Sequence, residues 1–121
     1  MTFEDFSKLT KARFDYCYQL LTGVKQDKYT RDNDRLQHFK VTGRIKNETP
    51  ERALWGMWSK QIASLLDVIE DLERNPLILP SEEILNELIS DNSNYPVLLE
   101  GLLRERKVDI PMNPPRHKVE K

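Results

Sequence analysis

Acidic side chains gather near the end of one strongly helical stretch of the sequence. Asp67, Glu70, Asp71 and Glu73 lie close together, and only Arg74 is near enough in sequence to offset their charge. The helix dipole disfavours carboxylates at the C-terminal end of a helix, so their accumulation there needs an explanation. One explanation is a Mg²⁺ site, because Mg²⁺ binds a few oxygen ligands and keeps several waters.

The periodicity of the same stretch offers a simpler explanation. Polar positions recur every three or four residues on the side nearly opposite the apolar positions. They are Lys60, Ser64, Asp67 and Asp71. A solvated outer surface explains such a row without any ligand. In the next helical stretch, polar positions flank the apolar face more closely and are better candidates for lining a groove. They are Glu87, Asp91 and Asn94.

Two further features have both a structural and a functional interpretation. Asn92 is polar on an otherwise apolar face, close to Pro96. It either satisfies backbone carbonyls released by the proline or pairs across a helix interface, and contact with a ligand is the alternative.

A basic segment precedes the long helices, at Arg31, Arg35, Lys40, Arg44 and Lys46. A solvated surface is the simpler interpretation of these cations, and anion or phosphate binding is the alternative.

Most catalytic signatures are missing from the sequence. There are only four glycines, and none of them form a phosphate-binding loop. Cys17 has no evident base partner, because His38 and His117 fall in unrelated segments. One cysteine and two scattered histidines do not have the spacing of a zinc site. Cys17 is therefore expected to be a small buried thiol, and His38 a surface or partly buried residue.

Amphipathic periodicity predicts the elements that must position these residues. Thr2 caps a first helix over about Phe3 to Val24, with Gly23 near its end. Leu36 and Phe39, with Ile45 as a further candidate, anchor a short helix that ends near Gly43.

The two long helices have the clearest start signals. Thr49-Pro50-Glu51 begins a third helix that runs to about Leu72. Residues 76–80, Pro-Leu-Ile-Leu-Pro, interrupt it, and Ser81 caps a fourth helix that Pro96 should kink. We therefore expect an all-α bundle of about four helices, with the two long ones antiparallel. Residues 1–106 form a single domain, and residues 107–121 form an irregular, proline-containing C-terminal tail.

Composition limits the functions that fit. The chain has 121 residues, of which 32% are charged and 38% hydrophobic, so a second copy could cover part of each helix. The formal net charge of −1 gives no global attraction to nucleic acid or to an acidic membrane. The acidic start is unlike a signal peptide, and no apolar run approaches the roughly 18 residues that span a bilayer. These features predict a cytoplasmic protein without a membrane span.

Two stretches carry a resemblance to known proteins. One is Asp34-Arg-Leu-Gln-His-Phe39, followed by Thr49-Pro-Glu51, Ala53, Met57, Lys60 and Ser64; the other is Glu87, Asp91, Asn94 and Tyr95 before a leucine-rich end. Together they resemble small helical phage and prophage proteins, which are distantly similar to the MazG-like all-α nucleoside triphosphate pyrophosphatases. The resemblance covers roughly residues 30 to 105.

In those enzymes, glutamates and an aspartate on two antiparallel helices hold Mg²⁺, which binds the triphosphate and activates water. The resemblance implies that Asp91 matches the aspartate of the second acidic motif, with Glu87 one turn before it. Lys60 matches a lysine of the phage proteins. The chain departs from the first motif, a glutamate pair three residues apart, because it reads Lys60-Gln-Ile-Ala-Ser64 there.

Two classes of function follow. The first is a phage-encoded accessory protein that acts as a non-catalytic interaction module and forms a homodimer, with residues 76–80 or the tail contacting a partner. The second is Mg²⁺-dependent nucleotide binding or pyrophosphohydrolysis. In that class Lys60, Asn94 and Tyr95 contact the nucleotide, and Asp67, Glu87 and Asp91 hold Mg²⁺. The missing glutamate pair favours the first class.

Overall fold

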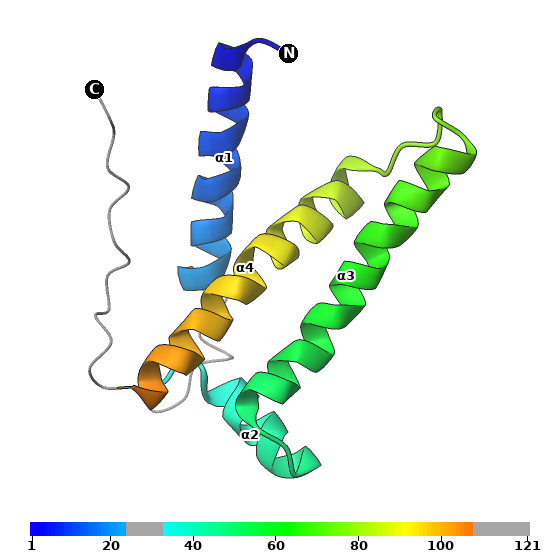
Figure 1. Ribbon diagram of the computed structural model, residues 1–121. Coiled ribbons are helices and arrows are strands. Elements are labelled where there is room, and N and C mark those ends of the chain that lie inside the picture. Colours follow the sequence, from blue (N-terminus) through cyan, green and yellow to red (C-terminus); the bar gives the residue numbers. More distant parts are fainter. Residues whose placement is uncertain (24–32, 108–121) are drawn as a thin grey trace.

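The computed structural model describes residues 1–23 and 33–107, and this part of the chain is built from helices (Figure 1). They are α1 (Phe3–Thr22), α2 (Gln37–Lys46), α3 (Pro50–Arg74) and α4 (Glu82–Arg106). The expected all-α bundle of about four helices is confirmed. Helices α3 and α4 run side by side in opposite directions and form an α3–α4 hairpin closed by the linker 75–81 (Figure 1). The predicted tail falls almost wholly at 108–121, outside the described residues.

Side-chain caps begin three of the helices where the sequence predicted them. The hydroxyl oxygens of Thr2, Thr49 and Ser81 each accept a hydrogen bond from a backbone N–H three residues on, at 3.0, 3.1 and 3.2 Å. Each bond satisfies one of the amides that a helix leaves unpaired at its first turn. Pro50 then occupies the first turn of α3.

The helix ends differ from the predicted ends by a few residues. Gly23 caps α1 at Thr22, and Val24 lies outside the described residues. Helix α2 continues past Gly43 to Lys46 and ends at Asn47, whose backbone is left-handed with φ of 55°. Asparagine tolerates this conformation better than most residues, so it can end a helix in place of glycine.

The best-packed part of the core lies at the end of the hairpin where α2 meets the start of α3 and the end of α4. Phe39, Leu54 and Leu102 are buried together there. Partly buried side chains surround them, namely Leu36, Met57, Trp58, Tyr95, Leu98 and Leu99. In the described part of the chain, three helices therefore share one small core, which does not run the length of the bundle.

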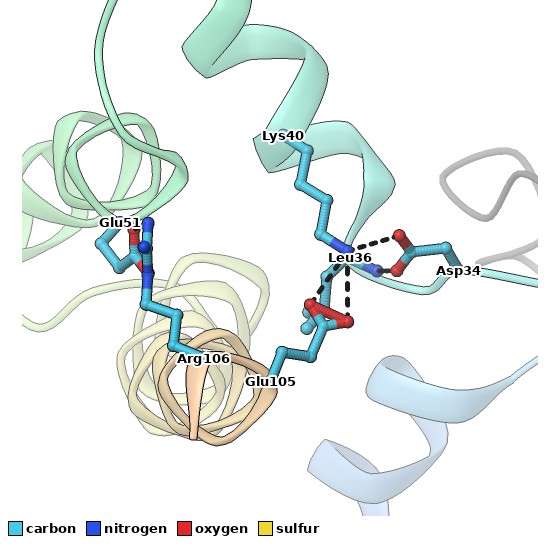
Figure 2. Close-up of polar contacts among 6 residues, drawn as sticks. All are labelled: Asp34, Leu36, Lys40, Glu51, Glu105 and Arg106. Carbon is cyan, nitrogen blue, oxygen red and sulfur yellow. Dashed lines mark hydrogen bonds and ion pairs between the residues drawn. The ribbon is translucent and has the colours of Figure 1, made fainter. Parts of the chain in front are cut away.

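Ion pairs hold the C-terminal end of α4 to its neighbours (Figure 2). Lys40 Nζ lies 2.6 Å from an Asp34 oxygen and 2.9 Å from a Glu105 oxygen, so α2 is tied to α4. The hydrogen bond from Lys40 holds the pKa of Asp34 below its usual value. Arg106 makes a two-armed contact with Glu51 and ties α4 to α3. These ion pairs join α2, α3 and α4 at the end of the hairpin that holds the core.

Asn92 joins α3 to α4. Its side-chain oxygen accepts a hydrogen bond from Trp58 Nε1 at 3.2 Å, and its amide donates to the carbonyls of Gln61 and Leu88 at 3.2 and 2.8 Å. Pairing across a helix interface is therefore the correct interpretation of this residue. The carbonyl that Pro96 leaves unbonded is that of Asn92 itself, so the amide does not compensate for the proline. Helix α4 continues through Pro96.

Helix α1 packs on α4, and its N-terminal half extends away from the hairpin (Figure 1). Arg13 donates to the Ser90 hydroxyl at 2.8 Å and to the Asn86 side-chain oxygen at 2.7 Å. Cys17 is buried, as predicted. Phe3 and Phe6 are 86% and 54% exposed, so the described residues cover only part of the apolar row that predicted this helix. None of the described helices is long and apolar enough to cross a membrane.

Candidate functional site

A pocket of about 330 Å³ lies where the four helices approach one another. Helix α4 supplies one wall, because Asp91, Asn94, Tyr95 and Leu98 follow the three- and four-residue spacing of one helix face. The other lining residues are Leu20, Leu21, Arg35, His38, Phe39 and Met57. Three residues predicted from the sequence, Asp91, Asn94 and Tyr95, are therefore brought together.

Asp91 is the acidic group of this pocket. Burial raises the pKa of its carboxyl, and the nearby carboxylate of Glu87 raises it further. Within the described residues no cation forms an ion pair with Asp91. A carboxylate that is partly desolvated beside a second carboxylate is the kind of group found in binding sites.

Asn94 and Tyr95 have structural contacts as well as a place in the pocket wall. The buried Asn94 side chain donates to the Cys17 carbonyl at 3.3 Å and so helps hold α1 against α4. The Tyr95 ring stacks on Trp58, with centroids 6.5 Å apart and an interplanar angle of 18°. These contacts with α1 and α3 hold both side chains in place in the pocket wall.

Arg35 and His38 bring basic groups to the same pocket. Arg35 Nε donates to the carbonyl of Leu21 at 3.0 Å, near the end of α1. His38 lies on the exposed side of α2 and lines the pocket rim. The sequence showed Arg35 only as part of a basic segment and gave His38 no site role, because neither residue can be placed opposite α4 without the tertiary fold.

The remaining predicted residues lie elsewhere. Lys60 and Asp67 are exposed on α3 and do not line the pocket, and Glu87 is exposed on α4. No group of three or more His, Cys, Asp or Glu among the described residues is arranged to hold a metal ion. The Mg²⁺ set of Asp67, Glu87 and Asp91 is therefore not assembled in the described part of the chain.

The chain was compared with family models, with curated proteins and with solved structures. None of these comparisons found a match. The phage and MazG-like resemblance consequently stays a prediction from the sequence. The pocket and the surface of the molecule are the features that bear on function.

A second candidate site is an exposed apolar surface on the α3–α4 hairpin, which we call the hairpin face. It consists of Trp55, Ile62, Leu66 and Ile69 on α3 and Leu85 and Leu103 on α4, all of them exposed. The α3 members recur at steps of seven, four and three residues and so lie along one line of the helix. A row of large apolar side chains in water is the usual mark of an interaction surface.

Helix geometry places the hairpin face away from α1 and α2. Met57 on α3 and Asp91 on α4 point into the pocket. At 3.6 residues per turn, Trp55 and Ile62 are rotated about 140 to 160° from Met57. Leu85 and Leu103 are likewise rotated about 120° from Asp91. Both rows therefore lie on the side of the hairpin that α1 and α2 leave uncovered.

Proposed function

We propose that the protein is a phage-encoded accessory protein of the host cytoplasm that acts as a non-catalytic helical interaction module. It forms a homodimer through the hairpin face. The observation that carries this proposal is the row of exposed Trp55, Ile62, Leu66 and Ile69 along α3. Burying this row against a second copy removes apolar surface from water, at roughly 25 cal/mol for each Å².

The non-catalytic part of the proposal is supported by the residues of the pocket. Asp91 is the one carboxylate among the described residues that line it, and the glutamate pair of the pyrophosphatases has no counterpart on α3, where Lys60 and Ser64 stand. Among the described residues the acids do not converge on a metal position. The pocket can bind a small molecule, but the described side chains offer no evident group to activate water beyond Asp91.

Sedimentation velocity tests the dimer directly. The 14.3 kDa chain should sediment as a species of twice that mass at micromolar concentration. Ile62→Glu with Ile69→Glu should give a monomer with unchanged helical circular dichroism, because two charges cannot be buried without partners. Val97→Glu, on an exposed part of α4 outside the hairpin face, is the matched control and should remain dimeric. A wild-type chain that stays monomeric at 100 μM or so would refute the proposal.

A second candidate function is nucleotide binding in the pocket. The observation that favours it is the convergence of Asp91, Asn94 and Tyr95 with Arg35. Thermal melts with a panel of nucleotides, with and without Mg²⁺, test it, because a ligand at 100 times its Kd stabilises a protein by about 2.7 kcal/mol. Tyr95→Ala should abolish a shift that Asp71→Asn leaves intact. No shift with any nucleotide would remove this candidate and leave the dimer proposal untouched.

A further inference from the structure

The two ends of the hairpin carry opposite charge. We call the linker end the hairpin tip and the end near Thr49 and Arg106 the hairpin base. At the tip, acids lie beside the hairpin face, namely Glu70, Glu73 and Glu82. At the base the neighbouring basic residues are Arg52, Arg106 and Lys107, and the acids Glu51 and Glu100 are already paired with Arg106 and Arg104. The hairpin face is therefore an apolar strip with an acidic end and a basic end.

The tip also presents apolar side chains that nothing in the described residues covers. Leu77, Ile78 and Leu79 are 88%, 51% and 72% exposed. They are held in a defined turn, because the Leu77 and Ile78 amides donate to the side chain and the carbonyl of Asn75 at 3.0 Å each. A backbone that is already held in a turn loses less conformational freedom when its side chains bind a partner.

The base has a shallow hollow with one apolar wall. Thr49, Glu51, Arg52 and Trp55 line a shallow depression beside the start of the hairpin face. The Trp55 ring is 43% exposed and offers it an apolar wall. Tip and hollow lie at opposite ends of one surface, so a single copy cannot bring them together.

We infer that the occupant of the hairpin face is a second copy of this chain packed head to tail, so that the tip of each copy sits on the base of the other. This inference rests on the dimer proposed above and names its geometry. A two-fold axis near Ile62, the midpoint of α3 (Pro50–Arg74), sets Trp55 opposite Ile69 of the second copy. The same axis sets Glu73 of the second copy opposite Glu51, whose charge Arg106 already offsets, and within one residue of Arg52. The interface closes on itself, so assembly stops at two copies.

The charges at the two ends of the hairpin favour head-to-tail over head-to-head packing. A head-to-head dimer would bring the acidic tips together and leave the hollow empty. Like charges placed opposite one another are strongly unfavourable at an interface, whereas opposite charges select the orientation. Head-to-tail packing pairs acid with base at both ends.

Charge reversal at Arg52 and Glu73 tests the geometry. R52E adds an acid to the first turn of α3, and E73R adds a base to its last turn, so both changes favour the helix itself. Each single variant should dimerise at least about tenfold more weakly in sedimentation equilibrium, because two like-charge contacts form. A mixture of the two variants should form a heterodimer of near wild-type affinity, and the double variant should dimerise with itself.

Two control variants carry the same charge changes elsewhere on the molecule. K8E and D71R make the same charge changes at exposed positions off the hairpin face and should leave the wild-type dimer constant within about twofold. A monomeric wild type overturns the dimer proposal and this inference together. Two results overturn the head-to-tail geometry alone. In the first, the single variants dimerise more weakly but mixing them does not restore affinity. In the second, both single variants dimerise as strongly as the wild type.

Discussion

Asp91 is a carboxylate that the fold holds in a partly desolvated position, with Glu87 nearby and no paired cation among the described residues. Because its folded pKa is raised, the wild-type protein loses stability as the pH rises from the unfolded value of 3.8 through the folded one. Asp91→Asn should therefore be more stable at pH 7 by a few tenths to about 1 kcal/mol. The gain should vanish near pH 3.

Urea unfolding of both proteins at the two pH values measures this difference. Asp71→Asn is the control, because it makes the same change at a carboxylate that is exposed on α3. An Asp91→Asn protein that is less stable than the wild type at pH 7 would show that the carboxylate makes a favourable contact. A group that weakens its own fold while lining a pocket is typical of a binding residue.

The sequence predicted some site residues and not others for a clear reason. Asp91, Asn94 and Tyr95 lie on one helix, so three- and four-residue spacing alone places them together. Arg13 and Arg35 donate hydrogen bonds to residues of other helices. The periodicity of their own segments cannot reveal these partners. Lys60 was predicted from resemblance alone, and in the structure it lies on α3 away from the pocket lining.

At the scale of single elements, two helical glycines differ in what surrounds them. A Cβ on Gly43 would lie 2.7 Å from the Glu48 carbonyl oxygen, which belongs to the backbone between α2 and α3. A Cβ on Gly56, within α3, would meet nothing within 4 Å. Gly43 is therefore required for the close approach of the chain after α2, whereas Gly56 only lowers helix propensity.

Alanine at each position tests this contrast. Gly56→Ala should raise the free energy of unfolding by about 0.5 to 1 kcal/mol, because alanine is the better helix former. Gly43→Ala should lower it by about 1 to 3 kcal/mol through overpacking against backbone. Thermal or urea unfolding of the two variants provides the measurement. Equal effects of the two substitutions would mean that the turn after α2 can relax without cost.

Helix starts were predictable because caps are local, and helix ends were less so. Thr49 and Ser81 bond to amides three residues away, so a few letters of sequence suffice. The end of α2 depends on Asn47 taking a left-handed backbone while Gly43 packs against the next segment. The contact of α2 with the chain that follows it therefore decides where α2 ends, and a local sequence pattern cannot predict this contact.

For the molecule as a whole, the contacts of α1 differ from those of the hairpin. Cys17 is the one buried residue of α1, whereas α2, α3 and α4 share the core of Phe39, Leu54 and Leu102. Helix α1 is held largely by directed bonds from Arg13 and Asn94. Elements with few buried apolar contacts open at lower free energy than the rest of a protein. We therefore expect α1 to detach from the hairpin before the hairpin unfolds.

Native-state hydrogen exchange tests this order, with Arg13→Met as the decisive variant. The methionine keeps an apolar stem but removes the donors to Ser90 and Asn86, and Ser90 is fully buried. Bonds from a charged donor are worth about 1.5 to 3 kcal/mol, so the opening free energy of α1 should fall by that amount. Amides of α3 near Leu54 should keep their protection, and Lys8→Met, on the far side of α1, should change neither helix. If α1 and α3 lose protection together in the Arg13→Met protein, the four helices form one cooperative unit, and α1 is no more separable than the hairpin it packs against.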